Sequence, residues 1–350
     1  MSALAIVTGA PGWLGTRLVD VLRNGLPEVP GLEAPLGDRT VRCLVLPGTD
    51  TEALRAFGKV EIVEGDLRDP QAIAKLCEGG KGATVFHVAG IIHPTHGAKE
   101  FTEVNVDGTR SLVESAEAAG ARRFVHVSSN SPIGTNPSPD HVFDESAPYN
   151  PYMGYGASKK AAEEIVNAAS ARGVLETAII RPPWFYGPGQ PPRQALFFEM
   201  IRDGKAPIVG GGENRRSMAY IDNICQGLLL CERVEQAKGG TYWIADRRPY
   251  TMNEIVGTIE TVMERDFGVK VNHGRMRLPG IASGVAYMLD AMIQGVGAYH
   301  QKLHVLSEMN KTIACTVAKA EKELGYDPKI DLEEGMRRSI QWMLDHGGKL

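Results

Sequence analysis

The sequence contains little cysteine and no excess of charge of one sign. Five of its 350 residues are cysteine, an odd number, and no two of them have the C-x-x-C spacing of a redox or zinc motif. A disulfide framework is therefore not predicted, and this cysteine usage is typical of a reducing cytoplasm. The 38 Lys and Arg nearly balance the 42 Asp and Glu, for a net charge of −4. Nothing in this balance favours binding to nucleic acid.

Long apolar runs are also missing. The longest uncharged stretch of this kind, Leu278 to Leu289, has twelve residues before Asp290, whereas a membrane-spanning helix needs ~20. Met1 leads into an apolar run without a basic segment, so no secretory signal is predicted. With 43% apolar and 23% charged residues, the chain is expected to be a globular, cytoplasmic protein without a transmembrane segment.

Short apolar runs alternate with helical patterns along the first half of the chain. The first run covers residues 4–7, and continuous runs of this length are typical of strands that are buried on both faces. Further runs occur near residues 41–46, 60–63, 83–88, 123–127 and 177–181. We therefore predict an α/β fold, a Rossmann-type doubly wound parallel sheet with helices on both faces.

The composition changes at Pro182, where prolines become frequent and a glycine run follows. We predict a first domain of residues 1–181 and a smaller, mixed substrate-binding portion of residues 182–350, parts of which return to the main sheet. Helices of this second portion are expected over residues 221–234, 252–265, 281–296 and 332–345, the last of them capped by Asp331. The proline-rich residues 24–39 are expected to form a surface loop.

The first chemical motif, Thr8-Gly9-Ala10-Pro11-Gly12-Trp13-Leu14-Gly15, follows the first predicted strand. Glycines permit a tight turn and a close approach to a pyrophosphate, and the N–H groups of the next helix stabilise its charge. The spacing is G-x-x-G-x-x-G, whereas the usual dinucleotide motif is G-x-G-x-x-G. An ordinary strand-to-helix turn could carry the same glycines. Its place at the first strand of an α/β pattern favours a cofactor site made by Gly9, Gly12, Trp13, Leu14 and Gly15.

The residue after the second strand usually distinguishes NAD from NADP, because an acid holds the ribose hydroxyls and a base holds the 2′-phosphate. Here this residue is Leu46, and no Lys or Arg occurs between it and Arg55. The sequence therefore favours NAD, with NADP as the alternative. After the third strand, Asp66 could hold the adenine amino group or could begin a turn before Pro70.

Tyr155 and Lys159 are four residues apart at the start of a predicted helix, which puts the phenol and the ammonium on one face. A fixed cation lowers the pKa of a tyrosine from ~10, so that it can exchange a proton with a substrate hydroxyl. The strand at residues 123–127 ends in Ser128-Ser129-Asn130-Ser131, whose hydroxyls could hold the same substrate oxygen. A Tyr–Lys pair alone is more often a surface pair, so the inference depends on the three motifs together.

These motifs resemble the extended short-chain dehydrogenase/reductase superfamily of the NAD-dependent epimerase/dehydratase type, over nearly the whole chain. The motifs that carry the resemblance are Thr8 to Gly15, Gly65-Asp66-Leu67, His87-Val88-Ala89-Gly90, Asn105 to Thr109, Ser128-Ser129, Tyr155 to Lys159, and Arg181-Pro182 through Gly189.

The resemblance implies that Tyr155 is the catalytic acid/base and that Lys159 binds the nicotinamide ribose and lowers the tyrosine pKa. It implies that Ser129 orients the substrate oxygen, with Ser131 as a second hydroxyl, and that Asn105 braces the sheet by hydrogen bonds. Residues 1–181 would then be the NAD(P)-binding domain, and the protein a homodimer through helices near residues 99–119 and 153–172. Further cofactor contacts are implied for Asp66, Leu67, Val88, Ala89, Gly90 and Pro182.

The carboxyl-terminal third resembles the branch of 3β-hydroxysteroid dehydrogenases and sterol-4α-carboxylate 3-dehydrogenases, in Tyr220 to Gly227 and in an extra apolar helix before Ala318 to Tyr326. One stripe of that helix could cover an apolar substrate or make a peripheral contact with a membrane surface. Ordinary packing onto the domain or a dimer partner is the commoner use of such a stripe. Its members are Ile281, Val285, Met288, Leu289, Met292, Ile293 and Val296.

Two substrate-binding candidates favour different substrates. Trp184 stands where nucleotide-sugar enzymes of the superfamily carry an Asn, and an aromatic wall suits an apolar substrate. Arg216 stands where those enzymes place an arginine on the diphosphate. It could instead pair with an acid such as Glu213 or Asp222. The loop at residues 129–132 lacks the Thr-Asp-Glu of the 4,6-dehydratases, which disfavours that reaction.

We therefore predict an NAD(P)-dependent oxidoreductase that moves a hydride between nicotinamide and a secondary alcohol or ketone of a sizeable, partly apolar small molecule. The second prediction is a nucleotide-sugar 4-epimerase, and the non-enzymatic alternative is an NAD(P)-sensing binding protein. No metal site is predicted, because His93 and His96 flank Pro94 in a loop and His300 and His304 lack a nearby third ligand.

Overall fold

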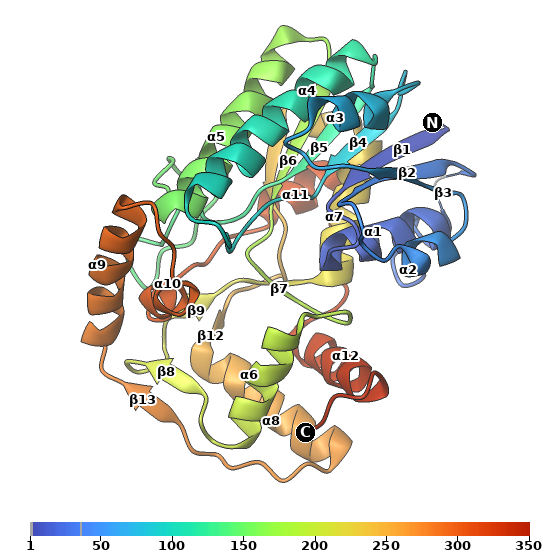
Figure 1. Cartoon of the computed structure of the whole chain (residues 1–350). Helices are drawn as coiled ribbons and strands as arrows, with labels where there is room; N and C mark the ends of the chain where they lie inside the picture. The colour runs from blue at the N-terminus through green and yellow to red at the C-terminus, as the bar shows by residue number, and fades with distance from the viewer. Residues whose placement is uncertain (1–2, 36) are drawn as a thin grey trace.

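The computed structural model of the chain describes residues 3–35 and 37–350 and is built on a seven-stranded parallel sheet (Figure 1). The strands lie in the order β11 (Gly240–Trp243), β6 (Glu176–Arg181), β5 (Arg123–Val127), β4 (Thr84–His87), β1 (Leu4–Thr8), β2 (Thr40–Val45) and β3 (Val60–Glu64). From β1 the chain first adds β2 and β3 on one side and then β4, β5 and β6 on the other, so the switch point of the sheet lies between β1 and β4. Ligands of such folds bind at the carboxyl ends of the strands beside this point. The predicted fold class is confirmed.

Helices cover both faces of the sheet (Figure 1). One face carries α3 (Pro70–Cys77), the π-helix η1 (Phe101–Asp107), α4 (Gly108–Ala118) and α5 (Met153–Arg172), with α4 between its neighbours. The other face carries α1 (Trp13–Asn24) against α7 (Ile221–Arg233), with α2 (Glu52–Ala56) and α11 (Ala318–Leu324) beside them. Ile6 packs into the core under α3, α4 and α5, and Val7 into the core under α1 and α7. Burial on both faces explains why the strands read as continuous apolar runs.

The later part of the chain forms most of a second lobe and adds β11 to the edge of the main sheet. Three small two-stranded sheets support the lobe: β7 (Trp184–Tyr186) with β10 (Met218–Tyr220), β9 (Arg215–Arg216) with β12 (Tyr250–Thr251), and β8 (Pro207–Val209) with β13 (Met276–Leu278). Its helices are α6 (Pro192–Arg202), α8 (Met252–Phe267), α9 (Ile281–Gly295), α10 (Gln301–Glu308) and α12 (Leu332–Asp345), whereas the short η2 (Glu235–Ala237) contacts α7, α11 and β11 at the main sheet. The Asp331 side chain accepts a hydrogen bond from the backbone N–H of Glu334, which confirms the predicted cap of α12.

The predicted strands and helices end within about two residues of those in the structure. None of the helices in residues 3–35 and 37–350 is long and apolar enough to cross a membrane.

The segment before β2 is less exposed than a surface loop should be. Its described residues form turns without regular structure, but Leu26, Val29 and Leu32 are buried in the core beside α1. Their spacing of three residues lets successive turns direct each side chain inward, a pattern that the prolines conceal. Arg39 is buried as well, and its Nη2 donates a hydrogen bond of 2.9 Å to Oε2 of Glu232 in α7. The surface-loop prediction is therefore wrong for these four residues.

Glu232→Gln should lower the free energy of unfolding by about 3–5 kcal/mol, because the buried Arg39 guanidinium would lose its counter-charge. A thermal unfolding scan measures the change. The control Glu333→Gln removes an exposed carboxylate that pairs with Arg265 and should leave the midpoint nearly unchanged. Equal midpoints for the two variants would show that the buried pair does not hold the loop to α7.

Candidate active site

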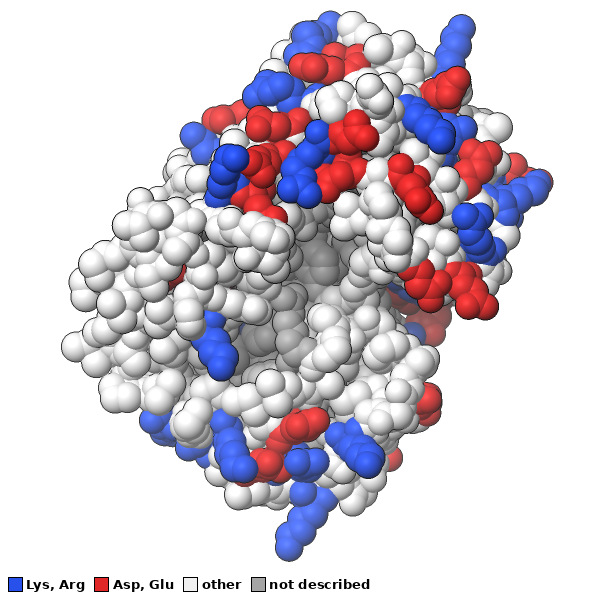
Figure 2. Space-filling view, viewed as in Figure 1, with Lys and Arg blue, Asp and Glu red and all other residues white. Residues whose placement is uncertain are grey.

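Four of the segments that contain predicted site residues follow strands of the main sheet directly and so lie at its carboxyl edge, whereas Trp184 and Arg216 belong to the small sheets of the second lobe. Gly9 follows β1, Val88 follows β4, Ser128 follows β5 and Pro182 follows β6. The surface of the molecule is hollowed between the upper lobe, which contains this sheet, and the lower lobe (Figure 2). Parallel strands thus bring four distant segments of the sequence to one site.

The glycine loop after β1 is closed so tightly that side chains would not fit. A Cβ on Gly9, whose φ is +90°, would lie 2.6 Å from the backbone nitrogen of Ala89, and one on Gly15 would lie 2.3 Å from the carbonyl oxygen of Gly9. Gly12 begins α1 and offers no side chain as a cap. The N–H groups of the first turn therefore point out of the helix without an intrahelical acceptor. Such an end fits a pyrophosphate.

Lys159 is buried against the end of β5. Its Nζ donates a hydrogen bond of 2.7 Å to the carbonyl oxygen of Val127 and lies 3.3 Å from Nε2 of His126. Burial lowers the pKa of Lys159 to about 8, although the negative charge of Glu163 acts in the opposite direction. The ammonium group therefore loses its proton more readily than an ordinary lysine.

Tyr155 lies one helical turn before Lys159, and Ser129 is its hydrogen-bond partner. Burial raises the pKa of Tyr155 to about 12, the hydrogen bond with Ser129 lowers it in part, and the charge of Glu308 raises it further. The lowering of the Tyr155 pKa by Lys159 stays a prediction, since burial, Ser129 and Glu308 account for the pKa of Tyr155 in this structure. The ammonium group of Lys159 directs its hydrogen bond to Val127.

Ser129 and Ser131 are both buried beside this tyrosine. The backbone N–H of Ser131 donates to Oγ of Ser129 at 3.1 Å, and the carbonyl oxygen of Ser131 accepts from the N–H of Tyr152 at 2.9 Å. The serine loop therefore positions both the Ser129 hydroxyl and the start of α5. The roles of the two hydroxyls toward a substrate stay predictions.

Asn105 braces the site as predicted. Its Oδ1 accepts from the N–H of Ile91 at 2.8 Å, and its Nδ2 donates to the carbonyl oxygen of Ile91 at 2.9 Å and to Oγ of Ser158 at 3.0 Å. One side chain thus joins the segment that follows β4 to α5. This contact holds Ala89 and Gly90 near Lys159.

Asp66 forms a turn with Arg68. Its carboxylate accepts hydrogen bonds from the backbone N–H of Arg68 at 2.8 Å and from Nη2 of the same residue at 2.6 Å. The cap of α3 is Asp69, whose side chain accepts from the N–H of Gln71. Asp66 therefore forms a turn, which was one of the two alternatives considered for it. Its contact with an adenine stays a prediction, as does the contact of Leu67 with the cofactor.

A buried histidine below the site was not predicted. His87 lies 2.8 Å from Oγ1 of Thr8 through Nδ1 and 2.8 Å from Oγ1 of Thr109 through Nε2. Burial lowers the pKa of His87 to about 3, with a further contribution from the charge of Lys159. His87 is therefore neutral and links β1 to α4. Its signal in the sequence is a polar residue within the apolar run at 83–88.

Arg216 does not have the acidic partners that were considered for it. Its Nη2 donates a hydrogen bond of 2.6 Å to the backbone oxygen of Glu308, and its buried Nε has no hydrogen-bond partner in the described part of the chain. Glu213 accepts from Asn253, and Asp222 pairs with Arg17. Pairing of Arg216 with Glu213 or Asp222 is therefore wrong. Its buried Nε is left without a hydrogen-bond partner among the described residues.

The side chain of Trp184 in β7 is half-buried beside Phe197, with 6.0 Å between the ring centroids. The two rings provide an apolar wall in the second lobe. Trp13 ties this region to the glycine loop, because its Nε1 donates to the carbonyl oxygen of Pro188 at 2.7 Å. Contact of Trp184 with a substrate, and of Pro182 with a nicotinamide, stay predictions.

The α10 helix contributes a group that the sequence did not reveal. The charge of Glu308 raises the pKa of Tyr152 as well as that of Tyr155, although burial is the main cause in both. About 150 residues separate Glu308 from these tyrosines, so no local spacing could connect them.

The apolar stripe of α9 faces away from the site. Ile281 is 75% exposed, Met292 61% and Val296 83%, whereas Ser283 and Asp290 lie on the inner side of the helix. Packing of this stripe onto its own domain, and its use as a cover over a substrate, are therefore wrong. Polar groups occupy the inner side because Asp290 binds His304 and Ser283 binds the backbone of α10.

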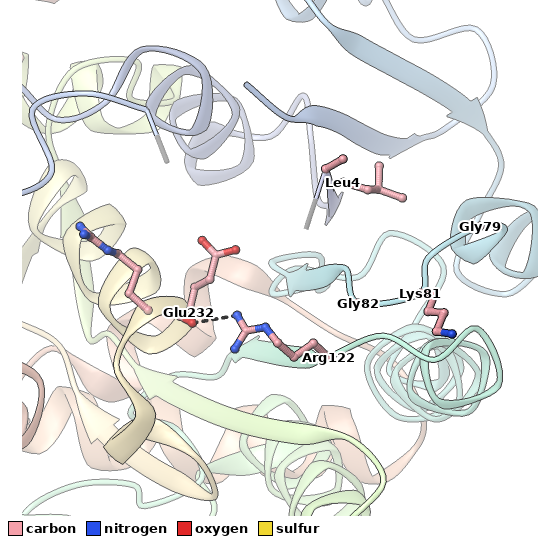
Figure 3. A pocket seen from close by; sticks show the side chains of 8 residues that line it. Leu4, Gly79, Lys81, Gly82, Arg122 and Glu232 are labelled. Atoms are coloured by element: carbon pink, nitrogen blue, oxygen red, sulfur yellow. Dashed lines mark hydrogen bonds between the residues drawn. The ribbon is translucent and has the colours of Figure 1, made fainter. Parts of the chain in front are cut away.

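Two cavities of the described chain are lined by other residues than the predicted site residues. One, of about 620 Å³, opens at the amino edge of the sheet between Leu4, Lys81 and Arg122, where Nη2 of Arg122 donates to the backbone oxygen of Glu232 (Figure 3). The other, of about 680 Å³, lies within the loop of residues 133–150. In residues 3–35 and 37–350, no group of three or more His, Cys, Asp and Glu side chains is placed to hold a metal ion.

Titration of the ligand-free protein tests the electrostatics of Tyr155. Because its pKa is raised to about 12, the phenol should stay protonated through the range near pH ~10 in which ordinary tyrosines ionise. The tyrosinate absorbance of the wild type and of Tyr155→Phe should therefore differ only in strong alkali. A difference between the two near neutral pH would mean that Lys159 already stabilises the phenolate.

Three comparisons relate the chain to known proteins. The model of the NAD dependent epimerase/dehydratase family matches residues 5–245. The chain is 51% identical to the uncharacterized protein y4nL of Sinorhizobium fredii, over 98% of this chain and 96% of that protein. It is 26% identical to 3beta-hydroxysteroid-dehydrogenase/decarboxylase isoform 1 of Arabidopsis thaliana, over 96% of this chain and 78% of that protein.

Among solved structures, the chain resembles DesIV, a dTDP-glucose 4,6-dehydratase of Streptomyces venezuelae solved with NAD and TYD bound. The TM-score is 0.75 at 26% identity, and the match covers 99% of this chain and 98% of that one.

Proposed function

Because the chain belongs to the NAD-dependent epimerase/dehydratase family, we propose that it oxidises a secondary alcohol, or reduces the matching ketone, on a sizeable and partly apolar substrate. The observation that carries the proposal is the contact of Tyr155 with Ser129, one helical turn from the buried Lys159. A phenol and a hydroxyl in contact can both bind one substrate oxygen, and proton transfer by such a group contributes typically ~10²–10⁴-fold to a rate.

The glycine loop and the first turn of α1 would hold the pyrophosphate of NAD, and Lys159 its nicotinamide ribose. NAD supplies the hydride acceptor when it is bound. In the oxidative direction, the Tyr155 phenolate would take the proton of the substrate hydroxyl and become the neutral phenol, while Oγ of Ser129 would donate a hydrogen bond to the same substrate oxygen. Lys159 favours the phenolate when its ammonium turns from Val127 toward Tyr155, because an opposite charge stabilises the ionised form.

An apolar substrate of the 3β-hydroxysteroid or sterol kind is supported by the aromatic wall of Trp184 and Phe197. The similarity to the Arabidopsis thaliana 3beta-hydroxysteroid-dehydrogenase/decarboxylase supports the same class. NAD is preferred over NADP because Leu46, which is exposed after β2, gives a 2′-phosphate no cation. The homodimer through residues 99–119 and 153–172 and the cytoplasmic location stay predictions.

A nucleotide-sugar 4-epimerase is the second candidate, and the unpartnered Nε of Arg216 favours it. A guanidinium with an available donor suits a diphosphate. An NAD(P)-sensing binding protein on the same fold would not need the contact of Tyr155 with Ser129, which argues for an enzyme.

Tyr155→Phe should lower turnover by ~10²–10⁴-fold with little change in cofactor affinity, because it removes the proton-transferring oxygen and leaves the glycine loop intact. Steady-state kinetics with a set of secondary alcohols, and calorimetry with NAD, measure the two quantities. The matched control is Tyr152→Phe, which removes a hydroxyl that binds Ser307 and not Ser129. Near-wild-type turnover of Tyr155→Phe would overturn the mechanism.

Arg216→Ala separates the two enzymatic candidates. With an apolar secondary alcohol, we expect its KM to stay within about threefold of the wild type, because no charged group of the substrate is lost. Arg215→Ala is the control, since this neighbouring arginine binds the backbone oxygen of Pro139. A KM for a UDP-sugar that rises by about a hundredfold in Arg216→Ala alone would instead favour the epimerase.

A further inference from the structure

The outer face of α9 is an exposed apolar surface. Met288 is 59% exposed and Met292 61%, and Val305 of the neighbouring α10 adds an apolar side chain that is 47% exposed. Over α9 and α10 the surface at the left edge of Figure 2 is nearly free of charge, whereas charged side chains gather above and below it. The exposed members of this face, called the α9 face below, are Ile281, Val285, Met288, Leu289, Met292 and Val296 of α9 and Val305 of α10, whereas the ring of Tyr287 packs on Tyr152 with 5.6 Å between the centroids.

Contacts on the inner side fix the orientation of α9. Oδ2 of Asp290 lies 2.8 Å from Nδ1 of His304 and accepts from Nε2 of Gln294 at 3.0 Å. Oε1 of Gln294 in turn accepts from the N–H of Gly154, at the start of α5. Rotation of the helix to bury the α9 face would break these contacts and expose the carboxylate of Asp290. The apolar side chains are therefore held toward the outside.

Cations without acidic partners flank the α9 face. Arg277 lies four residues before the helix, and Lys311 is beside its first turn, because Nδ2 of the adjoining Asn310 donates to the carbonyl oxygen of Gly280 at 3.2 Å. Lys302 lies near the other end, at the start of α10. Nη1 of Arg277 donates to the backbone oxygens of Gly210 at 3.4 Å and Gly211 at 3.3 Å. None of these three cations forms an ion pair with a residue in the described part of the chain.

Acidic groups are missing from the outside of the same segment. Between residues 268 and 317 the sequence has two acidic residues, Asp290 and Glu308. Asp290 is fully buried, and the charge of Glu308 acts on Tyr155 and Tyr152 at the site. The α9 face thus combines exposed apolar side chains with a rim of positive charge.

We propose that the α9 face binds the surface of a lipid bilayer with anionic headgroups. Apolar side chains of a helix that lies in the plane of a membrane enter the boundary between headgroups and acyl chains, and flanking Lys and Arg bind anionic lipids. A second copy of this chain fits less well, because a symmetric contact through the α9 face would bring the cationic rims of both copies together. This proposal does not depend on the reaction at the site.

Vesicle binding by the full chain tests the proposal. The wild type should sediment with vesicles of phosphatidylglycerol and phosphatidylcholine at about 0.1 M salt and should be released at about 1 M salt, because salt screens the cationic rim. Met288→Glu combined with Met292→Glu should weaken this binding by at least about tenfold, since two charges would enter the lipid. Both side chains are exposed, so the double variant should keep the thermal midpoint of the wild type.

The matched control is Val174→Glu combined with Leu196→Glu. It adds the same two charges at apolar residues that are 67% and 55% exposed outside the α9 face, and it should bind like the wild type. Equal binding by the α9 double variant, no binding by the wild type, or equal binding to pure phosphatidylcholine would overturn the proposal. A wild-type dimer in sedimentation that the α9 variant converts to monomer, without vesicle binding, would assign the face to a second copy.

Discussion

The site depends on a buried ammonium group at the end of β5. Lys159 can occupy this place because Val127 offers a carbonyl oxygen and Glu163 a negative charge one turn further along α5. Glu163 is itself held by Arg181 of β6 through hydrogen bonds of 2.9 and 2.6 Å. Burial also lowers the pKa of the neighbouring His126, so this imidazole adds no second positive charge. The compensation of the Lys159 charge thus fixes α5 against β5 and β6, and with α5 it fixes the candidate acid/base Tyr155.

The main sheet and its glycine loop could be predicted from the sequence because their causes are local. Strands buried on both faces appear as apolar runs, and the close approach of Gly9 to Ala89 permits no side chain. The order of Tyr155 and Lys159 on one helix follows from spacing alone. The bracing role of Asn105 came from the family resemblance, whereas its partners Ile91 and Ser158 are known from the structure, since no spacing rule connects these residues.

The remaining features depend on contacts between distant residues. Arg216 binds the backbone of Glu308, and Gln294 binds the start of α5, over separations that no periodic pattern spans. The stripe on α9 was recognised as apolar, but its direction depends on which side meets His304 and Gly154. Likewise, the turns that bury Leu26 and Val29 were hidden by prolines. The direction of the Lys159 ammonium group and the pKa of Tyr155 also could not be predicted from the sequence, because both depend on the three-dimensional arrangement of the site.

Trp13 connects the two lobes, because it is the first residue of α1 and its indole N–H donates a hydrogen bond to the carbonyl oxygen of Pro188. A ligand that moved the segment of Trp184 and Phe185 would therefore also move the first turn of α1, which is proposed to hold the pyrophosphate, and the reverse would be equally true. Linkage makes such an effect reciprocal: the factor by which one ligand changes the affinity of the other is the same in both directions. One indole hydrogen bond would thus make the two proposed binding events thermodynamically interdependent.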